Sequence, residues 1–208
     1  KGGAGGVRGG GGEESGDARR SEIVNEFEEP EFDKEDFVQH EQVHVVVTQE
    51  GWMKRIRTSN DPNTTRMREG DSLLFTAEAD TRDMLVVFSN LGNVYGVPVF
   101  DLAATPGFGE PVQKVLKFAD SEQILSLMVV KRDQLDGGGA ALPDLFVYSV
   151  RGFGFRVGMD QIISAKRSGK RLMKLTEGDT VQGIVPADKQ FVFLLSALGY
   201  GLHFLTSE

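Results

Sequence analysis

The stretch Val45-Val46-Val47-Thr48-Gln49-Glu50-Gly51-Trp52-Met53-Lys54-Arg55 has the pattern of a strand, a tight turn and a second strand. A β-branched run is followed by a hydroxyl residue, two variable residues and a glycine, after which another strand-forming run begins. The Thr48 hydroxyl can bond the backbone of the turn, and Gly51 can supply the positive φ that joins two strands at little steric cost. The stretch therefore predicts a β-hairpin.

The same pattern occurs three more times along the chain. Each copy has a β-rich run, a serine, two variable residues, a glycine and a second apolar run, and the copies are 86–95, 146–155 and 193–202. The four glycines of successive copies are separated by 41, 60 and 47 residues. A single match would arise by chance, but four matches flanked by β-branched or aromatic residues indicate a structural repeat.

A second recurring element lies between the hairpins. A basic residue precedes an apolar one, a short acidic turn follows, and a new apolar strand begins; the copies are 66–73, 117–124 and 174–181. Arg66, Lys117 and Lys174 therefore occupy one repeat position. Sheets of about four strands, spaced roughly 40–50 residues apart, cannot bury both faces alone and must stack on their neighbours. We expect an all-β, propeller-like array of about four such units.

The units differ in length at three places. The connector of the first unit is shortened, and a later unit carries extra residues, for which the loop 132–139 is the simplest location as a surface insertion. The fourth unit stops after its hairpin, at Glu208. Either it borrows strands from the N-terminal unit to close a ring, or the domain continues beyond the sequence given.

The N-terminal residues differ in composition from the repeats. Residues 1–21 are rich in glycine, which is typical of a flexible linker, and residues 22–42 are acidic with spaced apolar side chains. We expect this acidic arm either to pack aromatic side chains on the body or to be disordered. Residues 1–42 carry 5 basic and 12 acidic side chains, so they contribute −7 to the net charge of −8 and leave −1 for the domain predicted over 43–208.

Composition also excludes several kinds of protein. The chain has no cysteine and no apolar run of the roughly 18 residues that a membrane span requires, and its first residues lack the apolar core of a signal peptide. It is therefore predicted to be cytoplasmic, without a membrane partner or thiolate metal site. His40, His44 and His203 lack metal-ligand spacing, and the acidic pairs recur as turns, so we expect neither a metal site nor a catalytic residue.

Cations gather at the hairpin ends and before the acidic turns. On stacked blades, equivalent positions fall on one edge, where these side chains could form a track for phosphates. Gly169, flanked by cations, would let a phosphate approach the backbone closely. The candidate contacts are Lys54, Arg55, Arg57, Arg66, Arg68, Lys117, Arg151, Arg156, Lys166, Arg167, Gly169, Lys170, Arg171 and Lys174. The alternative is that they are ordinary solvated charges.

The ordered pieces resemble the C-terminal domain found in the A chain of DNA gyrase and in its topoisomerase IV counterpart. Val45-Val46-Val47-Thr48-x-x-Gly51-x-x-Lys54-Arg55, followed by Leu85-Val86-Val87-Phe88-Ser89-x-x-Gly92-x-Val94-Tyr95, resembles the opening blade of that domain. Upstream, 16–24 resembles the end of the breakage-reunion region, and 32–38 resembles the acidic lead-in to the first blade. The resemblance covers roughly residues 16–208.

This resemblance implies a β-pinwheel, a propeller-like disc whose blades exchange strands and whose basic rim bends or wraps double-stranded DNA. As partners it implies the remainder of the A subunit together with the ATPase B subunit, in a nucleoid-associated location in the cytoplasm. The DNA-cleaving tyrosine belongs to the preceding region, so Tyr95, Tyr148 and Tyr200 are not assigned that role. ATP and magnesium belong to the holoenzyme, and no cofactor is expected in this domain.

The chain departs from gyrase in one connector. Gyrase carries a basic box, Gln-Arg-Arg-Gly-Gly-x-Gly, after its first hairpin, whereas residues 58–65 are uncharged here apart from Asp61. The nearest remnant is 166–171. The resemblance therefore favours weaker bending, as in decatenating topoisomerase IV, over full wrapping. The second hypothesis is a propeller-like protein-interaction module that does not bind DNA, which the acidic net charge and the missing box favour.

Overall fold

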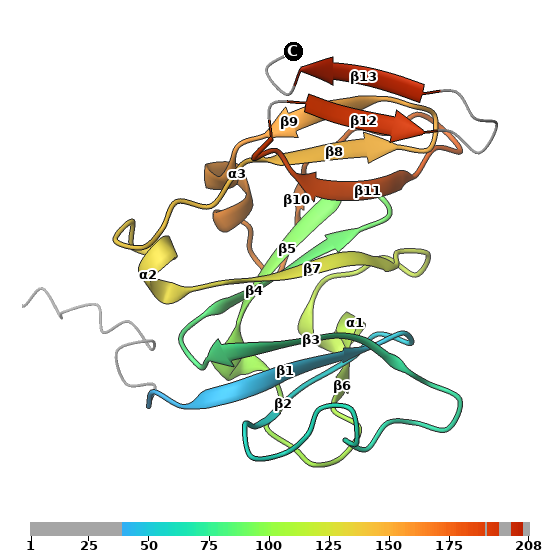
Figure 1. Ribbon diagram of the computed structural model, residues 1–208. Helices are drawn as coiled ribbons and strands as arrows, with labels where there is room; N and C mark the ends of the chain where they lie inside the picture. Colours follow the sequence, from blue (N-terminus) through green and yellow to red (C-terminus); the bar gives the residue numbers. More distant parts are fainter. Residues whose placement is uncertain (1–38, 190, 196–200, 206–208) are drawn as a thin grey trace, which may run out of the picture. The chain divides into compact units, whose positions relative to one another are not determined.

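The computed structural model describes residues 39–189, 191–195 and 201–205 (Figure 1). The chain divides into two compact units, Lys1–Asp33 and Lys34–Glu208. The first unit lies outside the described residues, as do most of the predicted linker and acidic arm. The described strands and helices all belong to the second unit.

The first two hairpins each lie inside a four-stranded antiparallel sheet. Sheet A has the order β3-β1-β2-β6 and sheet B the order β10-β5-β4-β7. The strands of sheet A are β1 (Gln42–Thr48), β2 (Trp52–Arg57), β3 (Leu73–Asp80) and β6 (Glu110–Pro111). The strands of sheet B are β4 (Met84–Ser89), β5 (Asn93–Pro98), β7 (Ile124–Val130) and β10 (Lys170–Arg171).

The remaining strands form two smaller sheets within the described residues. Sheet C has the order β11-β8-β9, with β8 (Leu145–Ser149), β9 (Gly154–Val157) and β11 (Val181–Pro186). Sheet D pairs β12 (Phe191–Leu195) with β13 (Gly201–Leu205). The short helical turns are η2 (Val99–Asp101), α1 (Val112–Val115), α2 (Arg132–Leu135) and α3 (Met159–Ile163). Helix α2 occupies half of the predicted loop 132–139, so that segment is not loop throughout.

Strands are exchanged between successive units, as Figure 1 shows for β6 and β10. The connector after the second hairpin supplies β6 to sheet A, and the connector after the third supplies β10 to sheet B. The Val112 N–H donates to Gly51 O over 2.8 Å, and the Leu172 N–H donates to Gly92 O over 2.9 Å. The connector at 58–72 contains no such strand, which explains why the first unit is shorter.

The first three hairpin turns are built alike. Gly51, Gly92 and Gly152 have φ values of 81°, 77° and 85°. The hydroxyl oxygen three residues before each glycine accepts a hydrogen bond from the N–H that follows the glycine, over 3.0, 3.3 and 3.3 Å. The predicted roles of the hydroxyl residue and the glycine are thereby confirmed at these turns. The fourth turn, at 196–200, lies outside the described residues.

Each acidic turn holds the strand that follows it against the preceding hairpin. Asp71 Oδ1 accepts the N–H of Glu50 over 3.0 Å, and Asp179 Oδ1 accepts the N–H of Arg151 over 3.2 Å. Both carboxylates also accept the N–H of the following residue. The sequence predicted these residues as turn-formers, and the structure adds a bond to the neighbouring hairpin. Strands β3, β7 and β11 begin after these turns, as predicted.

Apolar clusters lie between successive sheets. Neighbouring residues in a strand point to opposite faces, so Val87 belongs to the cluster between sheets A and B, whereas Val86 belongs to the cluster between sheets B and C. Phe146 of sheet C and Val192 of sheet D share a third, smaller cluster. Because the faces of sheet B are covered on both sides, its central strand is apolar without alternation. The predicted stacking of units is confirmed.

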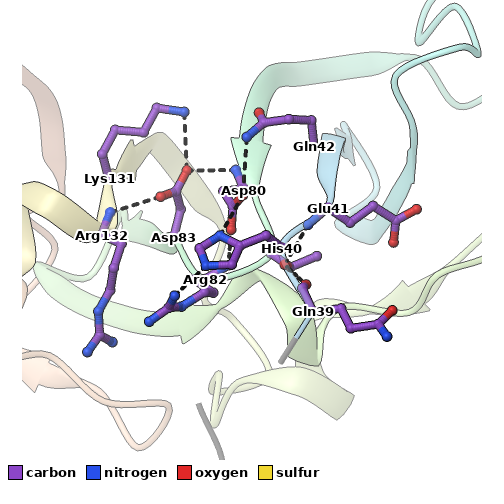
Figure 2. A network of polar contacts seen from close by, with 10 residues as sticks. Gln39, His40, Glu41, Gln42, Asp80, Arg82, Asp83, Lys131 and Arg132 are labelled. Atoms are coloured by element: carbon purple, nitrogen blue, oxygen red, sulfur yellow. Dashed lines mark hydrogen bonds and ion pairs between the residues drawn. The ribbon is translucent and has the colours of Figure 1, made fainter. Parts of the chain in front are cut away.

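A buried carboxylate joins sheets A and B. Asp83, at the start of the second hairpin, is 3% exposed. Its oxygens accept the Asp80 N–H over 2.8 Å, the Arg132 N–H over 2.8 Å and the Lys131 Nζ over 3.1 Å, as Figure 2 shows. Lys131 Nζ also donates to Glu78 O on β3 over 3.2 Å. Because these groups come from β3, from the residue before β4 and from the two residues after β7, the network fixes one sheet against the next.

Candidate nucleic-acid interface

The exchange edge is the edge at which β2 pairs with β6 in sheet A and β5 pairs with β10 in sheet B. Lys54 lies on β2 at this edge but is only 1% exposed. Its Nζ donates to Arg66 O and Gly107 O, each over 2.7 Å. Burial lowers the pKa of this ammonium group. The prediction that Lys54 contacts phosphate is therefore wrong, because its charge is used to hold two backbone segments together.

Tyr95 is the counterpart of Lys54 in sheet B. Its hydroxyl donates to Glu122 Oε2 over 2.8 Å and lies 3.5 Å from Lys117 O. Lys54 contacts the carbonyl of Arg66 in the same way, so the placement of Arg66 and Lys117 at one repeat position is confirmed. Burial, followed by the hydrogen bond to Glu122, raises the pKa of Tyr95.

Glu122 is a buried acid that sequence reasoning treated only as part of an acidic turn. It is 5% exposed and accepts hydrogen bonds from Tyr95, from Asn93 Nδ2 over 2.9 Å and from the Ala119 N–H over 3.0 Å. Burial opposes ionisation, yet the hydrogen bonds outweigh it and hold the Glu122 pKa below its ordinary value. The alternation of strand residues offered no signal for this contact, which joins residues 27 positions apart.

Two equivalent loops precede the donated strands and cross the exchange edge. Gly109 and Gly169 have φ values of 91° and 81°. A Cβ on Gly109 would lie 2.4 Å from Met53 O, and a Cβ on Gly169 would lie 2.5 Å from Tyr95 Cε1. Gly169 was predicted to admit a phosphate. The close approach it permits in this structure is instead to the Tyr95 ring.

Several predicted cations already have protein partners. Three arginines form ion pairs: Arg156 Nε with Asp144 Oδ2 at 2.8 Å, Arg57 Nε with Glu41 Oε1 at 4.0 Å, and Arg167 with Asp101. Three more cations donate to neutral oxygens: Arg55 Nε to Leu102 O at 3.1 Å, Arg151 Nη1 to Thr176 Oγ1 at 3.2 Å, and Lys170 Nζ to Gln161 O at 3.2 Å. Most of these side chains remain partly accessible. The three ion pairs offset the positive charge of their arginines, and the three bonds to neutral oxygens occupy donors that a phosphate would otherwise use.

The remaining predicted cations are exposed, and no ion pair involves them within the part of the chain that the structure describes. They are Arg66, Arg68, Lys117, Lys166, Arg171 and Lys174. Five of them lie beside the exchange edges, and Lys174 follows β10 by three residues. The Lys117 N–H donates to Arg167 O over 3.0 Å, so the loop bearing Lys166 lies next to Lys117. The structure thus brings together cations that are far apart in sequence.

The described surface is better suited to a polyanion than to a metal ion. Among residues 39–189, 191–195 and 201–205, no group of three or more histidine, aspartate or glutamate side chains could hold a metal ion. No described helix is both long and apolar enough to span a bilayer. What the surface offers chemically is a set of cations at equivalent sheet edges, which suits binding to a chain of phosphates.

Strand-exchanged sheets with cations at recurring edges define the class: a propeller-like domain of the β-pinwheel type. The family model for the DNA gyrase C-terminal domain, beta-propeller, matches residues 83–131 and 143–188. The two matched stretches coincide with the units β4–β7 and β8–β11. The resemblance seen in the sequence is confirmed, because two of the repeat units match the model of the DNA gyrase C-terminal domain.

Individual relatives agree with this assignment. The topoisomerase 4 A chain of Rickettsia felis is 25% identical over 153 residues, which is 73% of this chain and 19% of that protein. The DNA gyrase A chain of Dehalogenimonas lykanthroporepellens is 26% identical over 206 residues, covering 93% of this chain and 24% of that protein. The chain therefore spans about a fifth to a quarter of the length of these curated relatives.

Solved structures show the same fold. The E. coli ParC C-terminal domain matches with a TM-score of 0.68 and 21% identity, over 80% of this chain and 66% of that one. The C-terminal domain of a DNA topoisomerase IV matches with a TM-score of 0.69 and 23% identity, over 82% of this chain and 53% of that one. The predicted all-β, propeller-like architecture is confirmed.

Proposed function

We propose that this domain binds double-stranded DNA through the exposed cations of its exchange edges and bends it. The observation that carries the proposal is the equivalence of Arg66 and Lys117, because it places exposed cations of two successive sheets at matching positions. Within a type IIA topoisomerase, the domain would present the bent duplex to strand passage by the rest of the A subunit together with the ATPase B subunit. ATP and magnesium would act in the holoenzyme, in the bacterial nucleoid.

The charge distribution supports bending in preference to extensive wrapping. The gyrase-type basic box is absent from 58–65, and its nearest remnant, 166–171, has one arginine paired with Asp101 and one lysine bonded to a backbone carbonyl. Six exposed cations remain, and if each neutralises one phosphate, affinity falls about 10³-fold between about 50 and 200 mM salt. A salt dependence of this size corresponds to a short contact with the duplex.

The test is a salt titration of DNA binding, with bending read from energy transfer between dyes at the two duplex ends. The double variant Lys166→Glu with Arg171→Glu should lose most of its affinity, because each substitution replaces attraction to phosphate by repulsion. Lys189→Glu, near sheet D, is the matched control for each of the single variants Lys166→Glu and Arg171→Glu, since it makes the same charge change as either one. Wild-type affinity in the double variant, or an equal loss in the control, would remove the exchange edge from the proposal.

A second candidate function is protein binding by sheets C and D. Phe153 and Phe193 are 59% and 64% exposed, and a groove beside β9 is lined by Phe153, Phe155 and Met173. Exposed aromatic side chains of this kind are typical of protein interfaces. If no DNA binding is seen at the lower salt concentration, this second function is favoured over the first.

A further inference from the structure

Two arginines at the exchange edge of sheet A are stacked on aromatic rings. Arg66 Cζ lies 4.9 Å from the centroid of Phe108, and Arg68 Cζ lies 4.8 Å from that of Trp52. Both arginines are exposed, Trp52 is half-buried, and Phe108 is 37% exposed. Neither arginine has an ion pair among the described residues, so each guanidinium combines a fixed plane with N–H groups open to solvent.

The chain fixes these pairs through three separate segments. Lys54 Nζ binds the carbonyls of Arg66 and Gly107, so it ties the backbone of one stacked arginine to the residue before Phe108. Gly109 allows the loop that carries Phe108 to lie against β2. The aromatic ring of one pair is therefore delivered by the connector of the second hairpin, and its arginine comes from the connector of the first.

The equivalent edge of sheet B is built differently. Ser168 precedes Gly169 as Phe108 precedes Gly109, and Asn93 follows Gly92 as Trp52 follows Gly51. The counterpart of Arg66 is Lys117, on a flexible aliphatic stem. Sheet B therefore presents Lys117, Lys166 and Arg171, for which the described contacts include no aromatic ring, whereas sheet A presents two arginines that are stacked on rings.

Nearby carboxylates leave the arginines available. Asp71 Oδ1 accepts two backbone N–H groups, and Glu110 is paired with Lys114. Glu69 is the one acidic side chain next to Arg68 for which the described contacts include no partner. The two stacked guanidinium groups thus face solvent, and neither is held in an ion pair among the described residues.

We propose that Arg66 and Arg68, held by Phe108 and Trp52, form the primary phosphodiester site of the domain. This inference rests on the proposed function and says which of its cations bind first and tightest. A guanidinium matches a phosphate with two parallel N–H donors, and a stacked guanidinium loses less side-chain freedom on binding than an unsupported lysine does. Phe108 and Trp52 act as positioning residues that do not themselves contact a phosphate.

Charge and positioning have different signatures in a salt titration. Arg66→Ala removes a phosphate contact, so it should lower affinity and reduce the slope of log affinity against log salt by about 0.9. Phe108→Leu keeps every charge, so it should lower affinity about two- to fivefold with the slope unchanged. Phe108→Tyr keeps a ring and should retain wild-type affinity. Phe155→Leu on β9 removes an exposed aromatic ring elsewhere and serves as the control, so it should bind like the wild type.

Trp52 supplies a second readout, because it is the only tryptophan in the chain. Duplex DNA should change its fluorescence in the wild-type domain, and the change should be lost in Arg68→Ala while Lys189→Ala retains it. If wild-type protein binds DNA but Phe108→Leu and Arg68→Ala match it in affinity and fluorescence, this inference is overturned and the proposed function survives. If wild-type protein does not bind DNA at low salt, both fall.

Discussion

Replacing Lys54 by methionine tests whether its ammonium group binds phosphate or holds two backbone segments together. The substitution leaves the carbonyls of Arg66 and Gly107, now bonded over 2.7 Å each, without their donor. Hydrogen bonds to charged groups contribute about 1.5–3 kcal/mol each, and methionine regains part of the loss through its apolar contacts. We therefore expect the free energy of unfolding to fall by about 2–4 kcal/mol.

The pH dependence of this loss has a defined sign. Burial lowers the pKa of Lys54 in the folded state below its value of 10.5 in the unfolded chain. Between these two pKa values the unfolded state binds more protons, so the contribution of Lys54 to stability rises with pH in that window. The difference in unfolding free energy between wild type and Lys54→Met should therefore be larger near pH 10 than at neutral pH.

Urea unfolding followed by Trp52 fluorescence and by circular dichroism measures these differences. DNA titrations of the same variant should show weaker binding with an unchanged salt slope, because the ammonium group contacts no phosphate. Lys117→Met is the matched control: it should unfold like the wild type and lose about 0.9 from the slope. A Lys54→Met protein that is as stable as the wild type, or that loses slope as the control does, would refute the reasoning.

Three further outcomes are expected. Gly169→Ala should destabilise the domain by about 1–3 kcal/mol in thermal unfolding, because it places a methyl group against the Tyr95 ring at a positive φ. Asp101→Asn should raise DNA affinity and steepen the salt slope, since it releases Arg167 from its ion pair. Deletion of residues 1–38, which carry 5 basic and 11 acidic side chains, should strengthen binding at low salt if the arm competes with DNA for the cations.

Each of these outcomes has a contrasting case. Gly70→Ala also replaces a glycine of positive φ but has no atom within 4 Å of the new methyl group, so it should cost less than Gly169→Ala. Asp136→Asn is the control for Asp101→Asn, because it breaks the ion pair of Arg132 in the α2 turn instead. Equal DNA binding with and without residues 1–38 would show that the arm does not compete.

The hairpins and acidic turns were predictable because they depend on local rules. A hydroxyl residue and a glycine at fixed spacing close a turn wherever the flanking runs are strand-forming, and the chain repeats that signal. Stacking followed from the same pattern, since sheets with two apolar faces need neighbours. The short strand β6 was not predictable, because Glu110–Pro111 has no strand signal of its own and pairs only where sheet A accepts it.

The sequence by itself determined the repeat, the fold class and the set of cations that could meet DNA. Only the tertiary structure decided what each cation does, because the deciding contacts join distant residues: Lys54 meets Gly107 across 53 positions, and Arg167 meets Asp101 across 66. Lys54 and Lys117 were both predicted to contact phosphate, yet one is buried under a loop donated by the connector of the next hairpin and the other is exposed. The roles of these cations are decided by the exchange of segments between units. Local sequence spacing does not encode that exchange.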